Sequence, residues 1–328
     1  MTEPAGPGLG GVSSVVGRYF AVVSFMPSLL LVSWLLLLTG TGAWTGPPDW
    51  SRSVRSLTNV TVSGVVVFVL VALAVAALLH PLQFALVQVL EGYWGTSTFA
   101  MRLRAVRTEA HDRRRDRLME LAMAAAGRDR TIARVAHAEA ERELSYLPDS
   151  ENMMPTRLGN VLRRHEYDAG QEYALPVLTF AGQLAHVAPP EQVRYVNDQR
   201  TALDLAVKCC LIGLLGTVAA VVLLWQHGLW MIVALVPYLV AYGSYRGAVV
   251  VAHGYGRALQ DLVVLNRFAL YERLRLPMPV DTAHERTTNT TLFALTEEHS
   301  PEESVTYEHP VVQPVHDCHC QRPPEPTA

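Results

Sequence analysis

The sequence predicts an all-α membrane protein with four transmembrane helices and a helical cytoplasmic domain inserted between the second and third spans. Half of the 328 residues are hydrophobic, and many of them lie in blocks about as long as a bilayer is thick. The arginines are concentrated between and after these blocks, with sixteen of them between blocks two and three. Long apolar blocks separated by basic segments are typical of multi-pass membrane proteins.

Four blocks are long enough to cross the hydrocarbon core as helices, in which the backbone satisfies its own hydrogen bonds. Residues 226–228 alone separate the last two blocks, so these two are expected to form an antiparallel hairpin. Lys208, near the start of the third block, is expected to snorkel to the headgroups and to pair with Asp204. The predicted spans are Tyr19–Thr39, Val62–Leu79, Leu205–Trp225 and Leu229–Tyr245.

The distribution of positive charge predicts the orientation of the spans. The link between the third and fourth spans contains no arginine or lysine, whereas the chain from Arg246 onward contains seven arginines. The positive-inside rule therefore places both termini and the arginine-rich central segment in the cytoplasm, with the chain in the plasma (inner) membrane.

The same features divide the chain into five parts. His80-Pro81 interrupts the end of the second span, so the helix is expected to continue at an angle along the interface. The C-terminal part is rich in Pro, Glu and Thr and is expected to be disordered, apart from a short helix around 291–298. The predicted parts are an N-terminal cytoplasmic tail (1–18), a first transmembrane hairpin with an interfacial extension (19–97), a helical cytoplasmic domain (98–204), a second transmembrane hairpin with a helical extension (205–276) and the tail (277–328).

A helical hairpin is predicted at the start of the cytoplasmic domain. Residues 98–126 and 131–146 have helical character, and the pair is long enough to project well beyond the headgroups. The run HDRRRDRLME in its first arm fits a basic patch that contacts anionic lipid, or a solvated face with i,i+4 ion pairs. Nucleic acid is not an expected partner.

The stretch PTRLGNVLRRHEYDAGQEYALP, residues 155–176, is predicted to be a docking element. The helix expected to follow the fourth span carries a largely apolar surface that needs cover, and this stretch can provide it. We expect it to join the helix extensions into one domain, with polar contacts at the seam from Arg157, Asn160, Asp261 and Arg267.

Three stretches of the chain resemble a family of uncharacterised actinobacterial multi-pass membrane proteins. They are PTRLGNVLR, HPLQFALVQVLEGYWG and YGRALQDLVVLNRFALYERLRLPMP. The family has no assigned activity, so the resemblance implies an architecture and no particular chemistry.

Two groups of residues are candidates for chemistry. His316, Cys318, His319 and Cys320 in the tail are suitable zinc or copper ligands, although their spacing is tighter than in ordinary structural zinc sites. Ionisable residues near the inner membrane face suggest a transport pathway. This second group comprises His80, Glu91, His253 and Asp261.

The sequence contains no P-loop, G-x-G-x-x-G, H-E-x-x-H or G-x-S-x-G motif, so neither an enzyme nor a cofactor is predicted. A non-enzymatic, membrane-anchored scaffold or partner-binding module is the preferred interpretation. Its expected partners are the bilayer and a cytoplasmic protein or a second copy of the chain. The alternative is a component of a channel or transporter.

Overall fold

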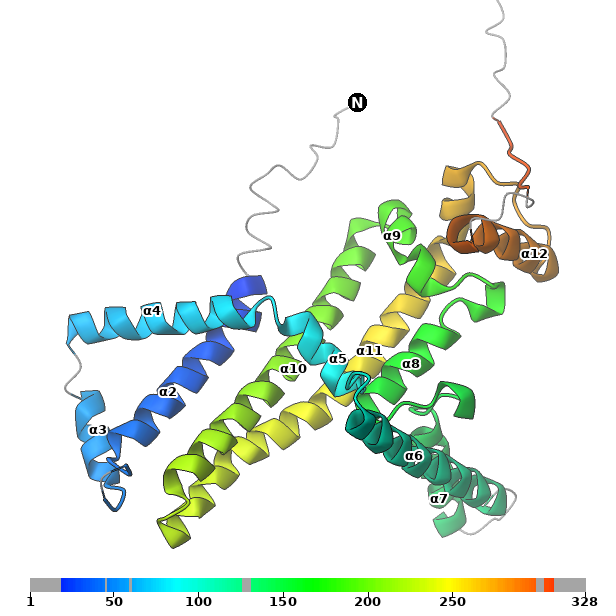
Figure 1. Cartoon of the computed structure of the whole chain (residues 1–328). Helices are drawn as coiled ribbons and strands as arrows, with labels where there is room; N and C mark the ends of the chain where they lie inside the picture. Colours follow the sequence, from blue (N-terminus) through cyan, green and yellow to red (C-terminus); the bar gives the residue numbers. More distant parts are fainter. Residues whose placement is uncertain (1–18, 45, 59–60, 126–130, 299–303, 310–328) are drawn as a thin grey trace, which may run out of the picture.

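A computed structural model gives the fold and describes residues 19–44, 46–58, 61–125, 131–298 and 304–309. Every regular element within these ranges is helical, so the predicted fold class is confirmed (Figure 1). Four helices are long and apolar enough to cross a membrane. They are Phe20–Gly40, Val62–Leu79, Pro190–Leu224 and Gly228–Leu274.

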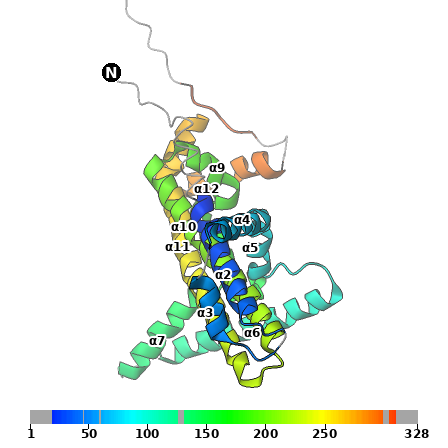
Figure 2. The same cartoon turned by 90° about the vertical axis from the view of Figure 1, so that its left-hand side faces the viewer.

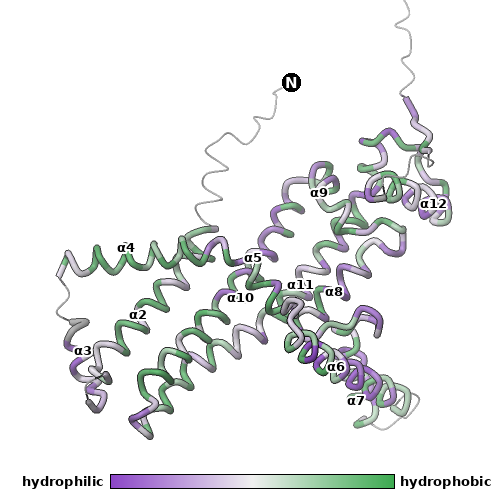
Figure 3. The backbone as a smooth tube through the Cα atoms, viewed as in Figure 1, coloured by the Kyte–Doolittle hydropathy of each residue, from purple (hydrophilic) through white to green (hydrophobic). Residues whose placement is uncertain are grey.

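The first two spans are joined by a short amphipathic helix. The first span begins as a π-helical turn, η1 (Phe20–Phe25), and continues as α2 (Met26–Gly40). The joining helix α3 (Trp50–Thr58), which the sequence did not predict, packs beside α2, and α4 (Val62–Leu79) forms the second span. Figure 3 shows that α4 is hydrophobic along its length. Only 11% of its apolar window is buried within the protein, as expected for a helix that contacts lipid.

The third and fourth spans form the long antiparallel pair that the short link predicts. Helix α10 (Pro190–Leu224) and helix α11 (Leu235–Leu274) are joined by the 3-10 turn η4 (Gly228–Ala234). Both continue well past the length of a bilayer, because 35 and 40 residues at 1.5 Å rise each exceed its thickness. We name the end at η4 and α3 the loop-side end, and the opposite end of the spans the domain-side end.

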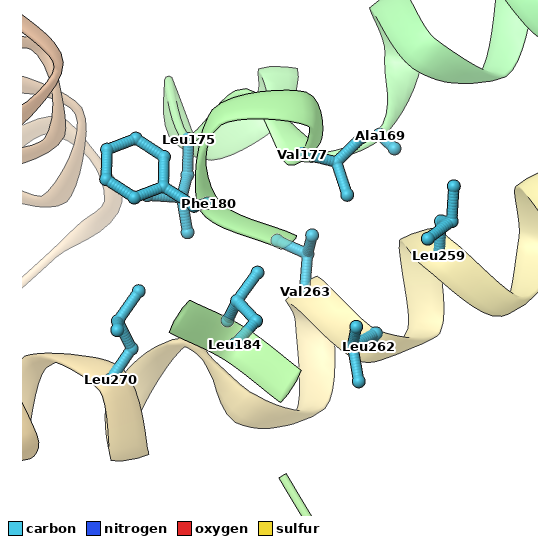
Figure 4. Close-up of a cluster of buried hydrophobic side chains, with 9 residues drawn as sticks. All are labelled: Ala169, Leu175, Val177, Phe180, Leu184, Leu259, Leu262, Val263 and Leu270. Carbon is cyan, nitrogen blue, oxygen red and sulfur yellow. The ribbon is translucent and has the colours of Figure 1, made fainter. Parts of the chain in front are cut away.

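Two helices cover one side of the extended α10–α11 pair. Helix α8 (Arg157–Asp168) and helix α9 (Val177–Val187) both pack on α11, and α9 was not predicted as a separate helix. Figure 4 shows the core that results, in which Phe180 and Leu184 of α9 meet Val263 of α11. Burial of these apolar side chains stabilises the domain.

The second span ends at the predicted break. Helix α4 stops at Leu79, and α5 (Gln83–Glu91) begins in a new direction after Pro81 (Figure 1). Proline has no amide hydrogen and cannot continue the helical hydrogen-bond ladder, which accounts for the bend. The new direction brings α5 against both α10 and α8.

The predicted hairpin forms, but it does not stand upright on the spans. Its arms are α6 (Thr98–Ala125) and α7 (Thr131–Leu144). Figures 1 and 2 show α6 running across the α10–α11 direction near the domain-side end of the spans. Both arms therefore run across the last two spans and do not continue along them.

Part of the predicted disordered tail is also helical. Helix α12 (Thr282–Phe293) and the π-helical turn Ala294–Glu298 follow the fourth span. Asp281 caps α12 by accepting a hydrogen bond from the His284 amide. Glu285 and Asn289 are buried against the domain, and Leu292 and Phe293 pack on its core, so the prediction of disorder is wrong for this segment.

Candidate functional site

A polar cluster lies at the domain-side end of the spans, and Lys208 is at its centre. The Lys208 side chain is 1% exposed. Its Nζ atom donates to Ser24 Oγ at 2.9 Å and to Gln83 Oε1 at 3.3 Å. A buried amine requires such partners, because removing it from water without them is costly. The expectation that Lys208 snorkels to the headgroups is therefore wrong.

Further hydrogen bonds extend the cluster to five groups around Lys208. The Tyr19 hydroxyl donates to Asp204 Oδ2 at 2.7 Å and accepts from Gln83 Nε2 at 3.1 Å. His80 Nδ1 lies 3.1 Å from Ser24 Oγ. Asp204 is thus hydrogen-bonded to Tyr19, across the bundle, and not to Lys208 as predicted.

Three different parts of the chain supply this cluster. Ser24 lies in the π-helical turn η1, a geometry that recurs at functional sites. The bend at Pro81 directs the buried Gln83 toward α10. Sequence reasoning missed Tyr19, Ser24 and Gln83, because each is an ordinary residue until the fold places it beside Lys208.

Toward the loop-side end the bundle becomes apolar and tightly packed. Its buried side chains there include Leu38 and Leu224. A Cβ atom at Gly213 would lie 2.7 Å from the Pro237 carbonyl oxygen, so α10 and α11 are in backbone contact. The Trp34 indole donates to the Gly216 carbonyl oxygen at 3.0 Å. Buried polar side chains recur at the loop-side end in Thr41 and Ser53, but the buried residues of the first span between Ser28 and Thr41 are apolar.

The predicted docking stretch meets the end of α5 at a close seam. Thr156 caps α8 by accepting from the Gly159 amide at 3.0 Å, and its hydroxyl donates to the Glu91 carbonyl oxygen at 2.8 Å. A Cβ atom on Gly159 would lie 2.0 Å from that same oxygen. Gly92 has a φ of 111° and lies against Pro155, so it allows α5 to end there.

Of the four predicted docking residues, Asn160 forms a local hydrogen bond, to a residue six positions earlier in the chain. It is fully buried, and its Oδ1 atom accepts from the Met154 amide at 2.6 Å. Arg157 instead lines a hollow between α6, α7, α8 and α11. Asp261 is exposed on the side of α11 that faces away from α9.

Arg267 is a docking residue for two segments, α12 and the predicted docking stretch. Its Nε atom lies 2.9 Å from Glu285 Oε1, and the Tyr271 hydroxyl donates to the same oxygen at 2.9 Å. The Arg267 guanidinium lies 4.2 Å from the centre of the Tyr173 ring, which follows α8. Arg267 thus joins α11 to α12 and to the loop between α8 and α9.

The remaining sequence candidates do not form one site. His80 belongs to the Lys208 cluster, and His253 Nδ1 lies 2.8 Å from His165 Nε2. Glu91 and Asp261 lie apart from both. No group of three or more metal-ligating residues occurs in the described part of the chain. The four candidate metal ligands in the tail lie outside it, within residues 310–328.

Glu91 is a half-buried carboxyl group with an altered titration. Burial and the nearby Glu166 carboxylate raise the pKa of Glu91 to about 7, against a smaller lowering by Arg163. The folded-state pKa of Glu91 lies above its unfolded value. The contribution of Glu91 to stability is therefore fully present below about pH 4.5 and is lost as the pH rises through about 7.

The substitution Glu91→Gln is therefore expected to remove this loss of stability at high pH. The variant should exceed the wild type in unfolding free energy by about 1 kcal/mol at pH 8, with partial exposure limiting the gain, and should match it near pH 4.5. Denaturant titrations of both proteins in detergent across this pH range measure the difference. A constant difference at all pH values would contradict the assignment.

No family model, curated protein or solved structure matches this chain. The fold itself defines the class: a helical membrane protein with four candidate spans, whose extended last two helices carry a folded domain.

Proposed function

We propose that the protein is a non-enzymatic, membrane-anchored scaffold in the plasma (inner) membrane, with both termini and the helical domain in the cytoplasm. Arginine supports this orientation, because sixteen arginines lie between spans two and three and none lies in the loop-side link between α10 and α11. The domain-side end of the spans then faces the cytoplasm.

The observation that carries the scaffold proposal is an open groove on the extended α10–α11 pair. One hollow of about 250 Å³ is lined by Tyr195, Asp261 and Leu265. It shares Glu191 and Tyr195 with a larger hollow of about 1030 Å³ that follows α10 toward Asp204. The two hollows form one elongated surface along α10 from Glu191 to Leu205, and this shape suits a polypeptide segment better than a compact metabolite.

The chemistry of the groove indicates the kind of partner. Tyr195 and Leu265 are 53% and 64% exposed, and they lie on the side opposite the core formed with α9. Large apolar anchors on a rigid helix pair with charged residues beside them suit an amphipathic helix of a cytoplasmic protein. The scaffold would hold this helix at the membrane.

The double variant Tyr195→Asp/Leu265→Asp is expected to abolish copurification of the partner from native membranes, because it places charge on both anchors. Tyr167→Asp/Leu178→Asp provides the matched control, since both residues are exposed on α8 and α9 outside the groove. Quantitative mass spectrometry of affinity-purified complexes measures the loss. Equal recovery of every copurifying protein with both variants would reject the proposal.

The alternative function, a component of a channel or transporter, is favoured by one observation, the buried polar cluster around Lys208. Lysine, aspartate, tyrosine and histidine side chains within a membrane protein can relay protons. The apolar loop-side half of the bundle argues against a path through a single copy. Proton flux into vesicles that is lost with Lys208→Met would favour this alternative over the scaffold.

A further inference from the structure

An arginine-rich cleft opens between α6, α7, α8 and α11. It consists of a cavity of about 100 Å³ and an adjoining groove of about 570 Å³, which share His111, Arg114 and Arg157. We name the two hollows together the arginine cleft. The arginines that line it are Arg107, Arg114, Arg117, Arg142, Arg157 and Arg246.

The positive charge of the cleft is poorly balanced. Glu143 is the only acidic residue among those lining the two hollows, and it is paired with Arg114 at 2.6 Å. The guanidinium groups of Arg107, Arg157 and Arg246 form no hydrogen bond or ion pair with the described part of the chain. Unpaired guanidinium groups around one hollow repel one another, and an anion bound there would relieve the repulsion.

His111, which lines both hollows, is affected by the same unbalanced positive charge. Its side chain is buried beneath the arginines. Burial lowers the pKa of His111, and the positive charges of Arg107, Arg114 and Arg157 lower it further. Three arginines from α6 and α8 thus lower the pKa of the same side chain, His111.

The cleft lies beside the end of the apolar part of the fourth span. Arg246 follows directly after the apolar part of α11, and Val249 and Val250 form an apolar wall beside it. Val250 is 63% exposed. Helix α6 crosses the last two spans at this level (Figures 1 and 2).

We propose that the arginine cleft binds a phosphate group, as carried by an anionic phospholipid headgroup or by a phosphate ester in solution. Guanidinium groups match phosphate oxygens with two parallel hydrogen bonds, and several of them can surround one phosphate. The apolar wall formed by Val249 and Val250 would accompany the glycerol and acyl part of a lipid. The site would fix the α6–α7 hairpin on the bilayer surface, whichever protein the scaffold binds.

The test uses the full-length protein purified in detergent, with phosphatidylglycerol, phosphatidylcholine and inorganic phosphate as separate probes. Arg157→Gln/Arg246→Gln is expected to weaken binding of phosphatidylglycerol at least about tenfold, because it removes two charged donors. Arg102→Gln/Arg134→Gln removes the same charge from exposed positions on α6 and α7 outside the cleft, and should bind as the wild type does.

The phosphate source is separated by the probes. Binding of phosphatidylglycerol without binding of inorganic phosphate or phosphatidylcholine assigns a lipid site, and binding of inorganic phosphate with the same dependence on Arg157 and Arg246 assigns a site for soluble phosphates. Glu143→Gln, which frees Arg114, should bind more tightly than the wild type and guards against a folding defect in the arginine variant. Absence of binding by all three probes, or equal binding by both arginine variants, would overturn the proposal.

Discussion

Gly159→Ala is expected to lower the unfolding free energy by about 3 kcal/mol, because a single added methyl group cannot fit at the seam between α5 and α8. The new Cβ atom would lie 2.0 Å from the Glu91 carbonyl oxygen and 3.0 Å from its carbon. These are backbone atoms, so no change of rotamer relieves the contact. The two helices must separate, and the Thr156 hydrogen bond to Glu91 is lost with them.

Gly182→Ala is the matched control for this substitution. Gly182 lies within α9, and a Cβ atom there would have no neighbour within 4 Å. Alanine is the better helix former, so this variant is expected to be more stable than the wild type by about 0.5–1 kcal/mol. Denaturant titration in detergent measures both. Equal stability of Gly159→Ala and the wild type would mean that the seam is not in contact.

Lys208→Glu is expected to cost about 3 kcal/mol or more, because it exchanges a buried cation for an anion one helical turn from Asp204. The Ser24 hydroxyl and the Gln83 amide can reorient to donate, but nothing in the described cluster would then balance two carboxylates. We expect low yield and early thermal unfolding in detergent.

Lys208→Met separates burial of the side chain from its charge. Methionine fills a similar volume, and replacing a buried charge with an apolar residue is often tolerated. This variant should therefore remain much closer to the wild type than Lys208→Glu in thermal unfolding. If Lys208 instead reached the headgroups, both substitutions would be tolerated alike, and that result would refute the buried cluster.

Much of the fold could be predicted because lipid imposes simple rules. A run such as Val62–Leu79 can satisfy its backbone only as a helix, and the helix α4 has these same bounds. Three residues between spans three and four leave no choice but a hairpin, and Pro81 can only interrupt a helix. These conclusions need nothing beyond local composition.

The elements that were missed depend on partners distant in sequence. Helix α9 is short, and the pairing of Phe180 with Val263 accounts for its position. Helix α12 is polar, and it docks through Glu285 to Arg267 and Tyr271. Helix α9 is apolar but too short to be predicted as a span, and the sequence analysis assigned no element to it. Helix α12 was placed in the disordered tail because its composition is polar.

The candidate sites divide in the same way. Asn160 is buried, as expected for a docking helix, but its side chain bonds to Met154 in the preceding loop. Arg157 lies one turn earlier on nearly the same face of α8, and it lines the hollow between α6, α7, α8 and α11. The cluster around Lys208 could not be assembled from the sequence, as its hydrogen-bonded members lie as many as 185 residues apart.

By itself, the sequence determined which segments cross the bilayer and, through its arginines, which orientation is expected, because both depend on the transfer of local segments into lipid. The tertiary structure alone decided that Lys208 is buried, that the α6–α7 hairpin lies across the spans and that unpaired arginines converge on one cleft. These features depend on which surfaces of distant helices meet, and the free energy of such contacts is not encoded in any one segment.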